Sequence, residues 1–346
     1  MIRILTDSAC DILPAEAQQL GVTVIPLNVT LEDGTVLRDG IDMTPSEYYT
    51  HLAACRKLPT TSQPSPEQFE RLYLDAAAAG DEVLGIFLSD ALSGTGQCAR
   101  LAADLANVDN VVFVNTENVC LGQSLLVRLA VQLRDAGKTI TQIAADLEKA
   151  KQHLHLVAAV DDLKYLRKGG RLSAAAAVAG GMLGIKPILA VMEGKVALAG
   201  KARGLPGVYV ALFKKIDELG GVDIAFGGIG INGHLAFNES QDELTPEEFA
   251  ALHTRVLAIS RETRTANAIG DLNGAIDAMP KKAVTIGMAE ILGAKKIRLG
   301  VFRDWHRSVV RQAAYGEVSA HFPATLIQRH PDAMIIVNAN AAKQPF

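Results

Sequence analysis

The sequence predicts an α/β fold of two domains, with mainly parallel sheets in three-layer arrangements. Strand-length apolar runs alternate with amphipathic helical patterns along the chain, which is typical of βα units. Two of these runs, EVLGIFLS at 82–89 and NVVFVNT at 110–116, are apolar at nearly every position, as in strands that are covered on both faces. The length of 346 residues also exceeds one ordinary core, so two domains are expected.

The first part of the chain contains strand, hairpin and helix signals in turn. IRILT opens the chain as a strand, and Glu32-Asp33-Gly34 is a hairpin signal between VTVIPLNVTL and TVLRDG. Thr44-Pro45-Ser46-Glu47 has the pattern of a helix start. The two apolar strands are each followed by a small-residue loop and an amphipathic helix, and a further helix is expected at about 141–152.

The rest of the chain continues the alternation of strand and helix. The expected elements are a strand at 154–160, an alanine-rich helix after residue 173, a hairpin over 186–200 with Glu193-Gly194 at its turn, a helix from about 204 to Glu218, a strand and glycine loop near 225–233, a helix that begins at Thr245, and strands over 256–260, 283–288, 296–302 and 333–338.

Composition excludes several functional classes. A net charge of −4 and a pI near 6.1 argue against a nucleic-acid-binding protein, which would have a basic face. No apolar run is long enough to cross a bilayer, and MIRILTDSACDI lacks the features of a signal peptide. The four cysteines show no CxxC spacing, so we expect reduced thiols in a cytoplasmic protein, with no metal and no cofactor.

Three hydroxyl-bearing segments are expected just after strand ends: Thr6-Asp7-Ser8, Thr60-Thr61-Ser62-Gln63 and Ser93-Gly94-Thr95. In open α/β sheets, ligands bind at the carboxyl ends of strands, where hydroxyls, backbone N–H groups and helix N-termini suit an anion. None of these segments contains a histidine, which favours binding without chemistry. The alternative is that each Ser or Thr only caps a helix.

The chain from Met1 to about Gly204 resembles the DegV family of fatty-acid-binding proteins. The resemblance rests on TDSACDI, TTSQPSPEQF, LSDALSGTGQ, NTENVCLGQSLLV and DDLKYLRKGGRLS…IKPILAVMEGKVALAGKARG, which occur in family order. It implies two α/β domains with a long-chain acyl group between them. It also implies that Thr61, Ser62 and the Ser93-Gly94-Thr95 loop hold the acyl carboxylate, that Arg171 organises the rim, and that a partner kinase phosphorylates the bound acyl group. The family's HxGPG loop, which completes the carboxylate site, is absent from this chain.

A glycine-rich segment with a histidine, AFGGIGINGHLAFNES, occupies residues 225–240. Its glycines allow positive φ angles and a close approach of the backbone to a ligand. A histidine held by a carboxylate is a common acid/base arrangement, and His234 is followed by Glu239. The alternative is a structural histidine at a turn between a strand and a helix.

From about Tyr209 the chain is similar to glucosamine-6-phosphate deaminases, which are hydrolases of carbohydrate metabolism. The matching pieces are ELGGVDIAFGGIGINGHLAFNES, ETRTANA, AVTIGMAEILGAKKIRL and FPATLIQRHPDAMIIVN. The resemblance implies a sugar-phosphate ligand at the loop of Gly228, Gly230 and Gly233, with His234 opening the sugar ring and Glu239 orienting His234. Asn232 stands where many members have aspartate, which would weaken the base.

Other parts of the deaminase pattern are missing. The family's phosphate loop and proton-shuttling aspartate belong to an N-terminal half that this chain lacks. Ile269 and the Trp305-His306-Arg307 segment replace basic residues, and Arg264 and Arg307 would compensate only in part. A base for the C1/C2 proton would have to come from Asp7 or Asp11.

We therefore interpret the chain as a hybrid, or chimera, joined near residue 205. The expected domains are 1–153 and 154–346, the second being DegV-like to about 204 and deaminase-like from about 209. Acyl binding is the first functional hypothesis, and a deaminase or isomerase that uses His234 and Glu239 is the alternative. A third possibility is a relic that has neither activity.

Overall fold

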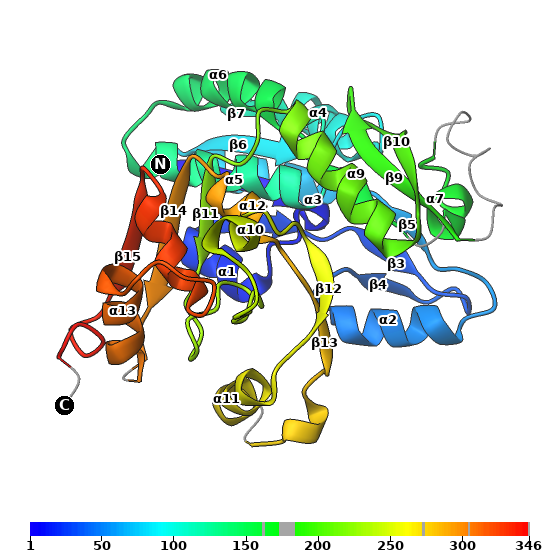
Figure 1. The fold of residues 1–346 in the computed structure, drawn as a ribbon. Coiled ribbons are helices and arrows are strands. Elements are labelled where there is room, and N and C mark those ends of the chain that lie inside the picture. Colours follow the sequence, from blue (N-terminus) through cyan, green and yellow to red (C-terminus); the bar gives the residue numbers. More distant parts are fainter. Residues whose placement is uncertain (161–162, 173–183, 272–273, 304, 345–346) are drawn as a thin grey trace. The chain divides into compact units, whose positions relative to one another are not determined.

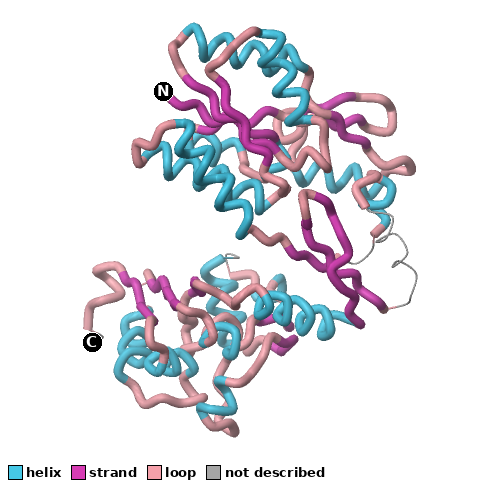
Figure 2. The backbone as a smooth tube through the Cα atoms, turned by 90° about the horizontal axis from the view of Figure 1, so that it is seen from above, coloured by secondary structure: helices cyan, strands magenta, loops and turns pink. Residues whose placement is uncertain are grey.

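The computed structural model describes residues 1–160, 163–172, 184–271, 274–303 and 305–344. The chain forms two compact units, Met1–Lys201 and Ala202–Phe346. Strands and helices alternate through both of them (Figures 1 and 2). The alanine-rich helix expected after residue 173 lies outside the described residues.

The first unit is built on a parallel sheet in the order β2-β1-β6-β7. Its strands are β1 (Ile2–Asp7), β2 (Val22–Ile25), β6 (Glu82–Phe87) and β7 (Val111–Asn115). Ile4 pairs with Val22 on one side and with Leu84 on the other, and Leu84 pairs in turn with Val112. All three pairings are parallel, so the carboxyl ends of these strands meet at one edge of the sheet.

Helices cover both faces of this parallel sheet (Figure 1). On one face, Ile4 and Leu84 pack in a core with residues of α1 (Pro14–Leu20), α5 (Leu121–Asp135) and α6 (Ile140–Ala150). On the other face, Leu5 and Val83 pack with residues of α3 (Pro66–Ala78) and α4 (Thr95–Ala106). The prediction of an α/β fold with parallel, three-layer packing is confirmed for this unit.

Two small sheets with antiparallel pairing complete the first unit. One has the order β4-β3-β5, with β3 (Asn28–Thr30), β4 (Val36–Arg38) and β5 (Thr60–Ser62). The other has the order β10-β9-β8, with β8 (Val157–Ala159), β9 (Ile185–Met192) and β10 (Lys195–Arg203). The hairpins expected at residues 32–34 and 193–194 are both present.

The run VTVIPLNVTL forms two strands rather than one. β2 joins the parallel sheet and β3 joins the small sheet, with Pro26 and Leu27 between them. Proline has no N–H to donate to a neighbouring strand, so the ladder is interrupted at this point. The break lets one apolar run supply strands to two sheets.

The second unit contains a parallel sheet in the order β11-β14-β15 and an antiparallel pair, β12-β13. The strands are β11 (Ile224–Gly227), β12 (Arg255–Ala258), β13 (Lys282–Thr285), β14 (Lys296–Val301) and β15 (Ala333–Val337). Ile297, Leu299 and Val301 alternate along β14 and point into one core. On the opposite face, Phe226 is 78% exposed and Met334 is 52% exposed.

Helix starts follow the expected capping chemistry. Thr44, Thr139 and Thr245 each accept a hydrogen bond from the third helical N–H and close a capping box. The other α-helices among the described residues are α2 (Pro45–Ala54), α7 (Lys164–Lys168), α9 (Gly204–Glu218), α10 (Pro246–Ala250), α11 (Arg261–Asp271), α12 (Met288–Leu292) and α13 (His306–Tyr315). Within the described part of the chain, none of the helices has the length and apolar character that a bilayer crossing requires.

Candidate functional site

The first unit places the segment around Ser62 beside the segment around Ser93. Thr61 and Ser62 lie on β5 and are exposed, so they belong to a strand rather than to the loop that we expected. The next residue, Gln63, lies directly against Gly94, where any side chain would overlap with the Gln63 amide. The Cys98 Sγ also donates to the Pro64 carbonyl at 3.4 Å. These two contacts hold the end of β5 at the start of α4.

Ser93, Gly94 and Thr95 form the N-terminus of α4. The Ser93 and Thr95 hydroxyl oxygens are 2.9 Å apart, and the Thr95 N–H donates to Ser93 Oγ at 3.3 Å. Gly94 is the N-cap residue and has no side chain to satisfy the first N–H groups of this 12-residue helix. A helix start of this kind carries partial positive charge and unsatisfied donors, which suit an anion.

Arg171 lies at the edge of the Ser93 segment. Its Nε donates to the Leu92 carbonyl at 3.3 Å, and its Nη1 donates to the Gly169 carbonyl at 2.6 Å. The residue is exposed, so the guanidinium charge is next to the segment without being buried in it. The structure thus gathers Thr61, Ser62, Ser93, Gly94, Thr95 and Arg171 in one region of the first unit.

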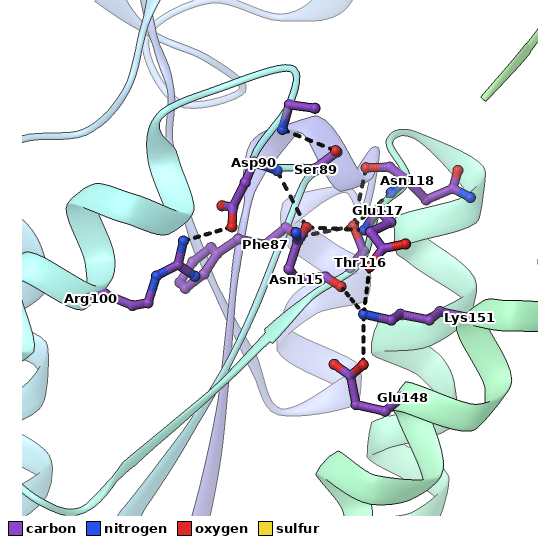
Figure 3. A network of polar contacts seen from close by, with 11 residues as sticks. Phe87, Ser89, Asp90, Arg100, Asn115, Thr116, Glu117, Asn118, Glu148 and Lys151 are labelled. Carbon is purple, nitrogen blue, oxygen red and sulfur yellow. Dashed lines mark hydrogen bonds and ion pairs between the residues drawn. The ribbon is translucent and has the colours of Figure 1, made fainter. Parts of the chain in front are cut away.

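A polar network fixes the carboxyl ends of β6 and β7 (Figure 3). Asn115 Oδ1 accepts from the Asp90 N–H at 3.3 Å and from the Glu117 N–H at 3.1 Å. Lys151, whose side chain is only 7% exposed, donates to the Asn115 carbonyl at 3.1 Å and pairs with Glu117 and Glu148. Arg100 of α4 pairs with Asp90 at 2.6 Å, so the network also reaches the helix that begins at the site.

The third hydroxyl segment, Thr6-Asp7-Ser8, is used inside the fold. Thr6 and Asp7 are both fully buried, and Ser8 Oγ accepts from the Leu27 N–H at 3.1 Å. The Gln123 Nε2 of α5 donates to Thr6 Oγ1 at 3.0 Å and to Asp7 Oδ2 at 3.2 Å. This segment supports its neighbours instead of presenting free hydroxyls.

In the second unit, the glycine-rich segment after β11 forms a tight turn around His234. The Gly230 N–H donates to the His234 carbonyl at 2.9 Å, and the Gly233 N–H donates to the Gly230 carbonyl at 3.0 Å. A side chain at Gly230 would overlap with the His234 ring, and Gly233 has φ +78°. Gly228 is close to the Gly300 carbonyl, at 3.4 Å from where a β carbon would be. Glycine is therefore required at positions 230 and 233 of this turn, whereas a β carbon at position 228 would make an ordinary contact.

Asn232, rather than Glu239, makes the hydrogen bond to the His234 ring. The Asn232 Oδ1 faces His234 Nδ1, and Thr263 Oγ1 is 3.5 Å from the same nitrogen. Glu239 accepts from the Ser260 N–H at 3.1 Å. Burial lowers the pKa of His234 below its ordinary value, and the charge of Glu239 opposes that effect. The ring is consequently neutral near pH 7.

His234 lines a cavity of about 810 Å³ in the second unit. Gly228 and Gly230 form part of the wall, and Phe226, Phe237 and Trp305 make much of it apolar. Arg264, which was expected to bind phosphate, donates to the carbonyls of Ile276 and Met279 at 3.0 and 3.2 Å. Its guanidinium is engaged with backbone beside α11.

Several residues of both sites were not singled out from the sequence. Gln63, Gln123 and Lys151 are polar residues without a motif of their own, and their roles depend on partners that are far away in the chain. A polar residue predicted on the buried face of a helix, such as Gln123, is the one signal that could have been followed. In the described ranges, no cluster of three or more His, Cys, Asp or Glu side chains is arranged to hold a metal.

Comparison with known proteins gives one consistent result for most of the chain. The model of the DegV family, described as "Uncharacterised protein, DegV family", matches residues 1–236, which is beyond Gly204, where we expected the resemblance to end. A DegV domain-containing protein of Deinococcus radiodurans is 38% identical over 229 residues, which are 65% of this chain and 81% of that protein. One from Caldanaerobacter subterraneus is 30% identical over 269 residues, which are 78% and 93% of the two chains.

Solved structures agree with the sequence relatives. A DegV family protein from Thermus thermophilus, described by its fatty acid binding, is 31% identical with a TM-score of 0.58, over 81% of this chain and 89% of that chain. DegV from Bacillus subtilis, described as a fatty acid binding protein, is 27% identical with a TM-score of 0.55, over 80% and 89%. A stearic acid-binding protein from Eubacterium ventriosum is 28% identical with a TM-score of 0.59, over 66% and 82%.

Proposed function

Because the chain belongs to the DegV family, we propose that it binds a long-chain fatty acid and holds its carboxylate with the hydroxyl segments of the first unit. The observation that carries the proposal is the position of Ser93 and Thr95 at the N-terminus of α4, where the N-cap residue Gly94 has no side chain, next to β5 and Arg171. Hydroxyl donors, unsatisfied N–H groups and one guanidinium are the chemistry that a carboxylate requires. The fatty acids named for the solved relatives support this ligand class.

We assign each of these residues a distinct role in carboxylate binding. Ser93 and Thr95 would donate hydroxyl hydrogen bonds, and the N–H groups at the start of α4 would add the helix contribution. Thr61 and Ser62 would supply further hydroxyls from β5, and Gln63 would keep β5 in place against Gly94. Arg171 would balance the charge from the rim. Among the described residues around Ser93, these roles involve hydroxyls, N–H groups and a guanidinium, and we propose binding without chemistry.

Native mass spectrometry of the protein purified from a bacterial host tests this proposal. We expect a non-covalent complex whose added mass equals that of a long-chain fatty acid. The Ser93→Ala variant should lose most of this species, and Thr23→Val, an exposed threonine of β2 away from the site, should retain it. A parent protein that is empty after incubation with excess fatty acid would contradict the proposal.

The resemblance to the DegV family also supports a cytoplasmic location and a protein partner. We propose that the bound acyl group is presented to a kinase that phosphorylates its carboxylate. Mixing the loaded protein with such a kinase and ATP should yield acyl phosphate, and the protein alone should yield none.

A second candidate function concerns residues 209–346, which resemble glucosamine-6-phosphate deaminase. The observation that favours it is the neutral, buried His234 in a glycine turn on the wall of a cavity of about 810 Å³. His234 would act on the ring oxygen of a sugar phosphate. Asn232 would fix the orientation of the His234 imidazole, and the charge of Glu239 would raise the pKa of His234. The family model and the relatives named above match DegV proteins and do not add support to this candidate.

Release of ammonia from glucosamine 6-phosphate tests the second candidate. If the site is active, the parent should form fructose 6-phosphate and His234→Ala should not. His253→Ala is a suitable control, because His253 is a largely exposed histidine of the same unit. Equal release by the parent and His234→Ala would exclude this site as the source.

A further inference from the structure

Asp7 is a buried carboxylate at the carboxyl end of β1 that receives three N–H donors. Its Oδ1 accepts from the Ala9 N–H at 3.0 Å, and its Oδ2 accepts from the Leu88 N–H at 2.9 Å and from Gln123 Nε2 at 3.2 Å. The three donors belong to the turn after β1, the end of β6 and helix α5. A single side chain thus joins three elements, and no cation balances it among the contacts described for it.

Leu88, whose N–H donates to Asp7, immediately precedes the turn that contains Ser93. The next residue, Ser89, accepts from the Leu92 N–H at 2.9 Å and from the Ser93 N–H at 3.1 Å through its carbonyl. The Ser89 N–H itself donates to the Asn118 carbonyl at 2.9 Å. Asp7 therefore holds Leu88 at the start of the segment from Leu88 to Ser93, which the Ser89 carbonyl closes as a turn.

We propose that Asp7 is a positioning residue of the carboxylate site and that its protonation state controls how firmly the turn from Leu88 to Ser93 is held. The proposal rests on the fatty-acid-binding function proposed above. Asp7 acts through the Leu88 N–H and the Ser89 carbonyl and makes no contact with the ligand in this account. It is thus a regulator of the site and not part of its binding surface.

The Gln123 amide is a second, independent observation that Asp7 and its partners can adopt two hydrogen-bonding arrangements, one with Asp7 ionised and one with Asp7 protonated. Its side chain is fully buried, and its Oε1 has no hydrogen-bond partner. When Asp7 is ionised, the amide donates to it through Nε2. When Asp7 is protonated, rotation of the amide by half a turn lets Oε1 accept the new O–H. The Leu88 N–H then faces a hydroxyl oxygen, which is a weaker acceptor than a carboxylate oxygen.

Burial is the largest influence on this carboxyl and raises the pKa of Asp7 to about 6, against the opposing effect of its N–H donors. The titratable groups around it are Cys10 and Asp11, at the turn after β1, and Cys120, just before α5. The pKa values of both thiols are raised by burial, to about 11 for Cys10 and about 12 for Cys120, so both are neutral near pH 7. The pKa of Asp7 near 6 places its change of charge between pH 5 and 7, and burial also raises the pKa of the neighbouring Asp11 above its ordinary value.

Ionisation of Asp7 has opposite effects on the global stability of the fold and on the order of the Ser93 turn. Because the folded pKa of Asp7 lies above its unfolded value, the folded state holds the extra proton between about pH 4 and pH 6. Global stability due to this group thus falls as the pH rises through that range. The order of the Ser93 turn rises in the same range, because the ionised carboxylate is the better acceptor for the Leu88 N–H.

Three measurements test the proposal, two without ligand and one with it. Without ligand, the ¹³C shift of the Asp7 carboxyl should titrate near pH 6, and the protection factors of the Leu88 and Ser93 amides should rise at least threefold from pH 5 to pH 7.5. With palmitate as the ligand, Asp7→Asn should bind about tenfold more weakly than the parent at pH 7.5 and about equally at pH 5. Asp75→Asn, at an exposed carboxylate of α3, should match the parent at both values.

The outcomes separate this proposal from the proposed function. A parent that fails to bind palmitate would sink the proposed function, and the ligand-free titration would still decide the role of Asp7. Binding by the parent with an unchanged pH profile in Asp7→Asn would overturn the inference alone. If Asp7→Asn does not fold, protection factors in the parent that are flat between pH 5 and 7.5 would overturn it instead.

Discussion

Gln63 lies against Gly94 so closely that a methyl group at position 94 would overlap with its side-chain oxygen. This relationship joins β5, with Thr61 and Ser62, to the start of α4, with Ser93 and Thr95. The two segments are about 30 positions apart in the chain, and neither contains a catalytic group. Their contact builds one polar surface from two short pieces of sequence.

Gly94→Ala should weaken fatty acid binding with little loss of stability. The group that must move is the end of a flexible glutamine side chain, and Gly94 has a negative φ of −78° that alanine also adopts. We expect the free energy of unfolding to change by less than about 1 kcal/mol and the dissociation constant to rise about tenfold. Fluorescence titration and chemical denaturation measure the two quantities.

Gly200→Ala is the matched control for this prediction. Gly200 lies on β10 in the same unit, and a β carbon there would meet only Ile188, at an ordinary 3.9 Å. It should leave both binding and stability close to those of the parent. Equal binding by Gly94→Ala and Gly200→Ala would show that the Gln63 contact does not shape the site.

Gly230→Ala should strongly destabilise the second unit. The new methyl group would overlap with the His234 ring, which is buried and held by Asn232, so it cannot move cheaply. We expect a loss of about 3 kcal/mol, as for overpacking in a core. Gly227→Ala, where a β carbon would meet only Leu299 at 3.4 Å, should cost much less. Similar losses for both variants would refute the tight turn described here.

The stability of the second unit should fall as the pH drops below about 6.5. Burial lowers the pKa of His234 in the folded state, so below the ordinary value near 6.5 the unfolded chain binds more protons than the folded one. The chain has a single tryptophan, Trp305, so its fluorescence during denaturation reports this unit. His234→Gln should reduce the pH dependence between 7.5 and 5.5. An unchanged slope would mean that His234 is not held neutral by burial.

Lys151→Met should destabilise the first unit by about 1–2 kcal/mol. The substitution keeps the buried aliphatic stem but removes the donor to the Asn115 carbonyl and the ion pairs with Glu117 and Glu148. Lys149→Met, at an exposed lysine near the end of α6 and two positions before Lys151, should be nearly neutral.

The pKa of Lys151 gives a second check on the network. Burial lowers this pKa, but hydrogen bonds to Glu148 and Glu117 outweigh that effect and raise the value overall. The stability from Lys151 should therefore be complete below about pH 10.5 and be lost as the pH rises above it. The parent should lose stability there faster than Lys151→Met, and parallel profiles would contradict the network.

Local patterns were enough to predict most of the elements. The capping box at Thr44, the hairpin turn at Glu193-Gly194 and the buried strands β6 and β7 each follow from a few neighbouring residues. The helix expected to end at about Glu218 ends there. These features are governed by short-range chemistry, which is readable in a single sequence.

The site was predicted less completely, because its geometry depends on residues far apart in the chain. Ser93 and Arg171 were identified, but nothing local indicates that Arg171 donates to the Leu92 carbonyl. The bonds from Gln123 to Thr6 and Asp7 span 117 and 116 positions, and only the packing of α5 on β1 brings them together. Pro26 was visible in the sequence, but its division of one run between two sheets was not.

The affinity difference between a fatty acid and the corresponding fatty alcohol tests the central claim most directly. The two ligands share an alkyl chain and differ in the head group that Ser93, Thr95 and the start of α4 would hold. We predict that the parent binds the acid at least tenfold more tightly at pH 7.5 and that Ser93→Ala loses most of this preference. Equal affinity of the parent for acid and alcohol would show that these hydroxyl segments do not bind a carboxylate.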